Sequence, residues 1–201
     1  AAWREPIVFD YKELRVISMA PPSSGGVTIG QILKMVEPYD LQAMGHNSAD
    51  YVQVLTEAMR RAYADRNYYL GDPDFVEIPI DELLDDDYLK ERMGSFNPEM
   101  ATLSADIAEG KVLFAESMET THYSIMDEEG NALAVTTTLN GAYGSKVYLD
   151  ELGFFMNNEM DDFSSKAGVP NMFGLIGADA NSIAPGKRML SSMTATIIEK
   201  N

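Results

Sequence analysis

The stretch TTHYSIMDEEGNALAVTTTLN, residues 120–140, contains two runs of alternating polar and apolar residues separated by the turn sequence DEEGN. Alternation with a period of two is typical of a half-buried strand, and Gly130 suits the left-handed backbone that a tight hairpin turn requires. The stretch therefore predicts two neighbouring antiparallel strands. Threonines stand at its entrance, Thr120 and Thr121, and near its exit, Thr136–Thr138.

The flanking sequence predicts helices before the hairpin and further strands after it. Ser48 is placed to cap the longest helix, in which we expect an apolar stripe of Tyr51, Leu55, Met59 and Ala62 to face the core. The predicted elements are a strand within 13–20, helices over 26–37 and 48–67, one or two short acidic helices within 79–93, short strands near 146–149 and 154–156, and a strand over 195–199. Helices first and antiparallel strands afterwards indicate an α+β fold.

The composition is that of one globular domain, residues 1–201. Of the 201 residues, 45% are hydrophobic and 23% are charged. The formal net charge of −17 argues against binding to nucleic acid or anionic lipid, because both attract clusters of Lys and Arg. The lack of cysteine excludes disulfides, thiolate metal sites and a cysteine nucleophile. No apolar run approaches the roughly 18 residues of a membrane span, and residues 1–10 lack the pattern of a signal peptide.

The paired threonines at the hairpin entrance have two interpretations. A threonine hydroxyl becomes a nucleophile when a base lies beside it, and the α-amine of the same residue can serve once the preceding peptide bond is cut. The reference pKa of such an amine, about 7.7–8.0, suits that role near neutral pH. Threonines are also good strand formers and can simply occupy a half-buried sheet. The residue pattern alone leaves both interpretations open.

Six segments, in order along the chain, carry a resemblance to a known family. They are PPSSGG (21–26), YADRNYYLGDPDF (63–75), TTHYSIMDEEGNALAVTTTLN (120–140), NNEMDDFS (157–164), GVPNMFGL (168–175) and LSSM (190–193). The sequence resembles the γ-glutamyltransferases (γ-glutamyl transpeptidases) of the N-terminal-nucleophile hydrolase superfamily over nearly its whole length.

The resemblance implies a role for the hairpin threonines. Thr120 corresponds to the nucleophile, and the Glu119–Thr120 bond to the autoprocessing site of a zymogen. Residues 1–119 would then be the C-terminal part of the large subunit, and residues 120–201 the N-terminal part of the small subunit. Thr138 corresponds to the threonine that contacts the nucleophile and assists its activation.

The resemblance also implies a site for the γ-glutamyl donor. Asn140, Glu159 and Asp162 correspond to residues that hold the donor α-amino group, and carboxylate and amide oxygens are suitable partners for an ammonium ion. Ser191 and Ser192 correspond to the pair that hydrogen-bonds the donor α-carboxylate. Residues 165–177 resemble a lid loop, with Phe173 at the position of an aromatic gate.

Each of these assignments has a structural alternative. Asp161 and Asp162 could be a solvated pair in a turn, although the resemblance favours the ammonium role for Asp162. Ser191 and Ser192 could stabilise a turn before the final strand. Ser23 and Ser24 lack the lysine and spacing of a phosphate-binding loop, so we expect them at the start of a helix.

The function implied is transfer of a γ-glutamyl group, through a γ-glutamyl-threonyl ester, from glutathione or a related compound to water, an amino acid or a peptide. This reaction needs no metal and no organic cofactor. A related acylase or poly-γ-glutamate transpeptidase is the enzymatic alternative, and a non-catalytic scaffold domain is the alternative from another class. By the same resemblance we expect an exported protein, in the periplasm or outside the cell.

The family's oxyanion-hole glycines and its α-carboxylate arginine correspond to positions outside residues 1–201. We therefore expect a central fragment, truncated at both ends, that is inactive without the remaining segments of its parent enzyme. The fold should be part of a four-layer αββα sandwich, with helices 26–37 and 48–67 on one side of a sheet that contains both the 120–139 hairpin and the final strand. Exposed sheet edges make self-association a further expectation.

Overall fold

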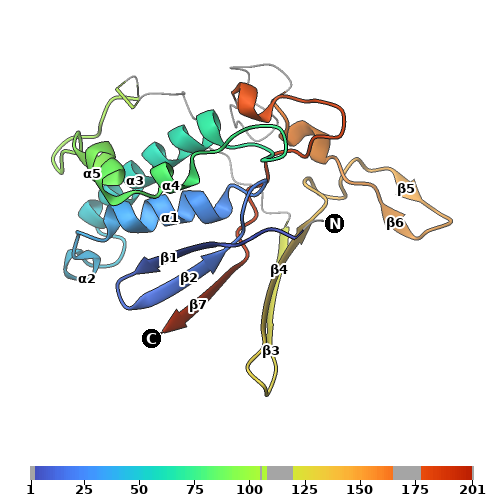
Figure 1. Ribbon diagram of the computed structural model, residues 1–201, viewed down its shortest axis with the longest axis horizontal. Helices are drawn as coiled ribbons and strands as arrows, with labels where there is room; N and C mark the ends of the chain where they lie inside the picture. The colour runs from blue at the N-terminus through green and yellow to red at the C-terminus, as the bar shows by residue number, and fades with distance from the viewer. Residues whose placement is uncertain (1–2, 105, 108–119, 165–177, 201) are drawn as a thin grey trace.

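The computed structural model describes residues 3–104, 106–107, 120–164 and 178–200. Its central element is a three-stranded antiparallel sheet with the strand order β1 (Ile7–Tyr11), β2 (Leu14–Ser18) and β7 (Thr196–Lys200). On the middle strand, Val16 pairs with Phe9 on one side and with Ile198 on the other. The first and last parts of the chain thus share one sheet (Figure 1), which confirms the predicted strands within 13–20 and over 195–199.

Helices cover one face of this sheet (Figure 1). They are α1 (Gly25–Val36), α2 (Leu41–Met44), α3 (Ala49–Tyr69), α4 (Ile80–Leu83) and α5 (Asp86–Met93). All the predicted helices are confirmed, and α2 is an additional one. The Ser48 hydroxyl accepts a hydrogen bond from the Tyr51 N–H at 3.1 Å, which is the expected cap of α3.

Helix α1 packs between the sheet and α3 and contributes to two apolar clusters. On the sheet side, Val27 joins the inward-facing strand residues in one cluster. Further along α1, Met35 and Val36 pack against α3 and α5 in the other. Full burial of each large apolar side chain contributes on the order of 1.5–3 kcal/mol. The buried members are Ile7, Phe9, Val16, Val27, Leu70, Leu83 and Leu190 in the first cluster, and Met35, Val36, Val54, Ala58, Ala62, Leu89 and Met93 in the second.

The buried face of α3 differs from the predicted stripe. Val54, Ala58 and Ala62 are fully buried, whereas Tyr51 and Met59 are only partly buried. Charged residues occupy buried positions of the same helix, and Arg61 forms an ion pair with Glu57 one turn earlier. Because α3 is covered on more than one side, its charged side chains are buried as partnered groups, and apolar spacing alone did not identify its core face.

The predicted hairpin is present as β3 (Thr120–Met126) and β4 (Ala132–Thr138). Gly130 has a φ of +84°, as the turn sequence indicated. The Asp127 carboxylate accepts hydrogen bonds of 2.7 Å from both the backbone N–H and the side-chain amide of Asn131. These bonds close the turn and lower the pKa of Asp127.

The expectation that the hairpin and the final strand share one sheet is wrong within the described residues, where β3 and β4 form a separate two-stranded sheet. Strand β4 lies beside β7, and both line one cavity, but the two strands diverge along their length (Figure 1). A hydrogen-bonded ladder needs strands about 4.7–4.9 Å apart along their length, which diverging strands cannot maintain.

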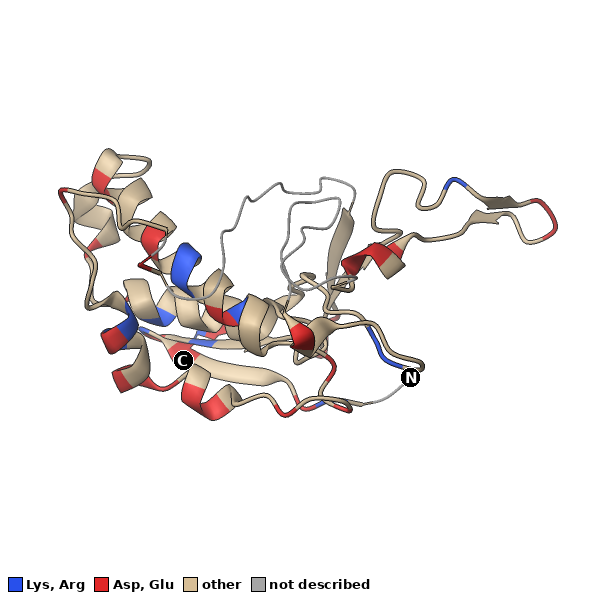
Figure 2. Cartoon of the chain, turned by 90° about the horizontal axis from the view of Figure 1, so that it is seen from above, with Lys and Arg blue, Asp and Glu red and all other residues tan. Residues whose placement is uncertain are grey.

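The remaining elements follow the hairpin. The two short strands predicted near 146–149 and 154–156 are present as β5 (Tyr148–Leu149) and β6 (Phe154–Phe155), which pair with each other and project from the body (Figure 1). Two 3₁₀ helices follow, η1 (Glu159–Asp162) and η2 (Asp179–Asn181). Acidic residues occur along the helices, at η1 and at the tip of the β5–β6 hairpin (Figure 2). Within the described part of the chain, none of the helices is long and apolar enough to cross a membrane.

Candidate active site

The first residue of β3 lies opposite the last residue of β4. Thr120 and Thr138 are directly paired in the antiparallel register, and Thr121 pairs with Thr137 at the next position. Directly opposed residues have Cβ atoms about 4.5–5.5 Å apart and project on the same face, whereas the next pair projects on the other face. The hairpin therefore brings the predicted nucleophile and its predicted helper together.

The exit of β4 is fixed to the segment that precedes η1. Asn140 has a φ of +76° and a side chain that is buried, a backbone conformation that asparagine tolerates better than most residues. Its backbone N–H donates to the Thr138 hydroxyl at 3.0 Å. Asn158 holds the neighbouring residues, because its N–H donates to Leu139 at 3.1 Å and its side-chain oxygen accepts from Gly141 at 2.9 Å.

The 3₁₀ helix η1 completes the predicted ammonium-binding group. Glu159 and Asp162 are three residues apart, and a 3₁₀ helix places residues at this spacing on the same side. The Asn140 side chain is hydrogen-bonded to Asp162. The structure thus brings Asn140, Glu159 and Asp162 together, while Asp161 is exposed.

The electrostatics of this group favour a cation. Burial raises the pKa of Asp162 to about 6, and the charges of Glu159 and Asp161 add to the rise. The charge of Arg66 and the hydrogen bond from Asn140 act in the opposite direction. Burial also raises the pKa of Glu159. Two carboxylates that are costly to ionise together would be stabilised by an ammonium ion between them.

The two serines have different hydrogen bonds. The Ser191 hydroxyl accepts from the backbone N–H of Met193 at 3.2 Å, so Ser191 stabilises this turn, as the structural alternative predicted. The Ser192 hydroxyl accepts from Arg66 Nη2 at 2.8 Å. A hydroxyl can donate one hydrogen bond and accept two, so neither bond uses the proton with which these serines could bind a carboxylate.

Ser23 and Ser24 hold the serine pair in place. The backbone N–H and the hydroxyl of Ser24 both donate to the Ser191 carbonyl oxygen at 2.8 Å, and the Ser23 hydroxyl donates to the Met193 carbonyl oxygen. Helix α1 begins immediately afterwards, as predicted, but the Ser24 side chain does not cap it. The segments 21–26 and 190–193 therefore lie side by side although they are far apart in the sequence.

Arg66 is a buried residue of this region that sequence reasoning missed. It lies near the end of α3 and is 5% exposed. In addition to Ser192, it donates to the Ser24 hydroxyl from Nε at 3.1 Å and to the Asn67 side-chain oxygen from Nη1 at 3.0 Å. The available signal was the YADRN sequence near the end of the helix, where charged and amide residues replace the apolar pattern.

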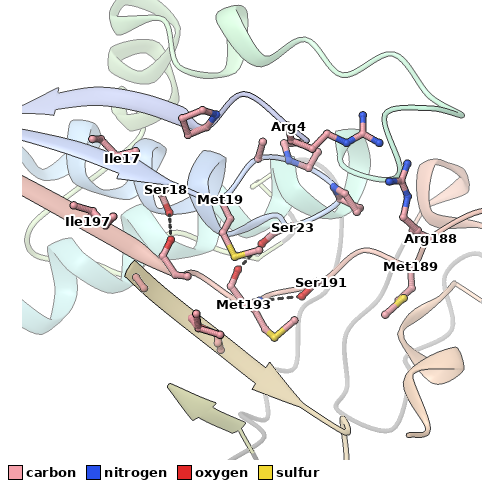
Figure 3. Close-up of a pocket in the computed structure, with 18 residues that line it drawn as sticks. Arg4, Ile17, Ser18, Met19, Ser23, Arg188, Met189, Ser191, Met193 and Ile197 are labelled. Carbon is pink, nitrogen blue, oxygen red and sulfur yellow. Dashed lines mark hydrogen bonds between the residues drawn. The ribbon is translucent and has the colours of Figure 1, made fainter. Parts of the chain in front are cut away.

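A cavity of about 650 Å³ lies beside this region (Figure 3). Its walls come from the ends of β2 and β7, from the segment 19–23, from the middle of β4 and from the segment 188–193. Of the seven described candidate residues, only Ser191 lines it. The cavity is mainly apolar and is distinct from the group formed by Asn140, Glu159 and Asp162.

Comparison with protein-family models shows that the sequence matches a known family over its whole length. Residues 1–201 match the model described as Gamma-glutamyltranspeptidase. The chain belongs to the γ-glutamyltranspeptidase family. This confirms the resemblance that the six sequence segments indicated, including membership of the N-terminal-nucleophile hydrolases.

Two curated relatives match almost the whole chain of this family member. The glutathione hydrolase proenzyme of Escherichia coli (strain K12) is 49% identical over 201 residues, which are 100% of this chain and 35% of that protein. The acylase ACY 1 proenzyme of Pseudomonas sp. (strain V22) is 38% identical over 198 residues, 98% of this chain and 33% of that protein. The chain thus spans about a third of the length of these relatives.

A solved structure shares the fold. The crystal structure of cephalosporin acylase from Bacillus halodurans aligns with 100% of this chain and 33% of its own, with a TM-score of 0.75 and 22% identity. This likeness supports the predicted mixed helix and sheet architecture.

Some predictions for this family member lie outside the described residues. They concern Glu119, on the leaving side of the proposed processing bond, and the segment 165–177 with Phe173. Among the residues that the structure describes, no group of three or more His, Asp or Glu side chains is arranged to hold a metal ion.

Proposed function

We propose that the full-length protein is a γ-glutamyltransferase and glutathione hydrolase, made as a proenzyme and activated by cleavage of the Glu119–Thr120 bond. The proposal rests mainly on one observation: the hairpin that pairs Thr120 with Thr138 leads directly into Asn140, the first residue of the predicted ammonium-binding group. Thr120 faces Thr138 at one end of the sheet register, and two residues later Asn140 is hydrogen-bonded to Asp162. The glutathione hydrolase relative supports the same assignment.

In the proposed reaction, cleavage exposes the Thr120 α-amine, which accepts the proton of the Thr120 hydroxyl as its oxygen attacks the γ-carbonyl carbon of the donor. The carbon–nitrogen bond of the γ-glutamyl amide breaks, and the leaving amine takes the proton. Water, an amino acid or a peptide then attacks the γ-glutamyl-threonyl ester and restores the hydroxyl. Thr138 is the proposed helper, because it is the direct register partner of Thr120 and projects on the same face of the hairpin, while its hydroxyl accepts a hydrogen bond from the Asn140 N–H.

Donor selection would use both ends of the amino-acid group. The α-ammonium would bind among Asn140, Glu159 and Asp162, where it offsets the repulsion between the two carboxylates. The α-carboxylate would accept hydrogen bonds from Ser191 and Ser192. No step in this scheme requires a metal or an organic cofactor.

The proposal includes the complete architecture. The described helices and sheets would be part of a four-layer αββα sandwich that the remaining segments of the parent complete. The proposed cleavage would divide residues 1–119 from residues 120–201 as parts of the large and small subunits. Both parts would contribute to the proposed donor site. Ser24 and Arg66, which precede the cleavage point, hydrogen-bond to Ser191 and Ser192, which follow it.

A second candidate is an acylase that uses the same nucleophile, which the relationship to the acylase ACY 1 proenzyme favours. An acylase for donors without an α-amino group would use Thr120 but would not need the ammonium-binding group. Hydrolysis of γ-glutamyl-p-nitroanilide compared with glutaryl-p-nitroanilide separates the two, because these compounds differ only in that amino group. Preference for the glutaryl compound would refute the assignment of Asn140, Glu159 and Asp162.

Intact mass of the full-length protein tests the nucleophile. We expect two polypeptides in the wild type with Thr120 at one N-terminus, and a single uncut chain in Thr120→Ala. The hairpin supplies matched controls, since Thr121→Ala and Thr137→Ala change the adjacent register pair on the opposite face. These variants should be processed. An uncut wild type, or processing of Thr120→Ala, would refute the proposal.

A further inference from the structure

Arg66 differs from the other buried arginine of its helix, Arg61. Arg61, 1% exposed, forms an ion pair with Glu57, so its charge is compensated within α3. Arg66, 5% exposed, donates only to neutral oxygens, those of Ser24, Asn67 and Ser192, and forms no ion pair within 4.0 Å among the described residues. Burial of a charge without a carboxylate in direct contact is costly, so a purely structural arginine would be expected to resemble Arg61.

Arg66 acts on the proposed donor site from helix α3, whereas Glu159 and Asp161 act on it from η1. Its guanidinium interacts electrostatically with Asp162, and it holds the hydroxyl of Ser192. The charged and titratable groups that act on Asp162 are Glu159 and Asp161 from η1 and Arg66 from α3, while Tyr63 acts on Arg66 from the same helix. Arg66 is the one cation in this set.

We infer that Arg66 is a positioning residue for the donor site: its guanidinium fixes the Ser192 hydroxyl and places the positive charge that balances Asp162. This inference rests on the proposed function. One arginine would thereby connect the carboxylate-binding and ammonium-binding ends of the site. The planar guanidinium donates to three acceptors in fixed directions. A lysine ammonium has the same charge but cannot reproduce this geometry.

Two substitutions separate the geometry of Arg66 from its charge in the full-length protein. Arg66→Lys keeps the positive charge but loses the planar guanidinium and its fixed hydrogen-bond directions. We therefore expect the KM for γ-glutamyl-p-nitroanilide to rise about tenfold to a hundredfold, which is the range for loss of one hydrogen bond from a charged donor. The decrease of kcat/KM at low pH, the acid limb of its pH profile, should stay at the same pH as in the wild type. Arg66→Met also removes the charge that lowers the pKa of Asp162, so its acid limb should move to higher pH.

Arg61→Lys is the matched control, because it changes a buried arginine of the same helix that does not touch the site. It should lower thermal stability without changing the KM or the acid limb. If Arg66→Met does not fold, a double-mutant cycle of Arg66→Lys with Ser192→Ala decides the question. The two effects on KM should be less than additive in free energy, since each removes the same contact.

The possible results distinguish the inference from the function on which it rests. A wild type that does not hydrolyse the γ-glutamyl compound refutes the proposed function and the inference with it. An active wild type whose Arg66 variants keep the normal KM and acid limb refutes the inference alone. Additive effects of Arg66→Lys and Ser192→Ala would also refute it.

Discussion

Replacement of Arg188 by methionine should destabilise the protein by about 3 kcal/mol, because it leaves a buried carboxylate without its counter-ion. The Asp72 side chain is 0% exposed. Arg188 donates to it through Nε at 2.9 Å and Nη2 at 2.7 Å, and its backbone N–H donates at 2.9 Å. In Arg188→Met the Asp72 carboxylate keeps only the hydrogen bonds from two backbone N–H groups, those of residue 188 at 2.9 Å and of Asp74 at 3.2 Å. Loss of two hydrogen bonds from a charged donor, each worth roughly 1.5–3 kcal/mol, supports the same magnitude.

The pair Arg15–Glu199 provides a matched control. Its atoms are 2.9 Å apart, but the two side chains are 48% and 49% exposed. Exposed pairs contribute about 0–1 kcal/mol, so Arg15→Met should have a small effect. The unfolding free energy of each variant can be measured by urea denaturation of the 201-residue chain, followed by circular dichroism. A loss in Arg188→Met no larger than that in Arg15→Met would refute the argument.

The pH dependence provides an independent check. Hydrogen bonds from Arg188 outweigh burial and lower the pKa of Asp72 in the folded protein. A lowered folded-state pKa gives stability that is present above the unfolded-state pKa, about 3.9, and is lost as the pH falls through the folded-state value. The difference between wild type and Arg188→Met should therefore narrow below about pH 4. A difference that stays constant from pH 7 to pH 3 would contradict the ion-pair explanation.

Three further predictions concern the site and the surface. Under the proposed function, Asp162 must be ionised to bind the donor ammonium, so kcat/KM of the full-length protein for γ-glutamyl-p-nitroanilide should fall below a pH of about 6, and Asp162→Asn should remove this pH dependence along with most activity at every pH. Gly25→Ala should cost roughly 1–3 kcal/mol in thermal or urea unfolding, because its Cβ would lie 2.8 Å from the Met193 carbonyl oxygen and overlap the Thr194 hydroxyl; Gly141→Ala, with its nearest contact at 3.4 Å, should cost less. The exposed hairpin residues Tyr123, Ile125 and Leu133 should cause the 201-residue chain to self-associate in sedimentation velocity, and Ile125→Lys should reduce the associated fraction.

Local patterns in the sequence were sufficient for most elements of the fold. The hairpin was predictable because its alternation and its turn chemistry lie within one short stretch. The helices were predictable from apolar spacing and from the Ser48 cap. Strand β1 was missed although its buried Ile7 and Phe9 alternate with exposed residues. This alternation spans only five residues, and the assignment of β1 as an edge strand depends on its pairing with β2, which the local sequence does not show.

Long-range contacts explain what the sequence did not show. The pairing of β7 with β2 joins residues at opposite ends of the chain, such as Arg15 and Glu199. Ser23 and Ser24 were expected at a helix start, and they are there, but their partners belong to the segment 191–193. The resemblance selected Asn140 and Asp162, yet only the three-dimensional arrangement brings Arg66 to Ser192. The rest of the site was hidden because its contacts join segments that have no local relationship.

These long-range contacts also bear on what the proposed cleavage can do. After a cut at Glu119–Thr120, the two pieces would remain joined by the β2–β7 pairing, by the bonds of Ser24 to Ser191, and by Arg188 with Asp72. Each of these contacts pairs a residue before the cut with one after it, and none requires the severed peptide bond. The new α-amine would thus form at the start of a strand while the donor site, which needs both pieces, stays assembled. Cleavage would change the chemistry at Thr120 without releasing the groups that are proposed to hold the donor.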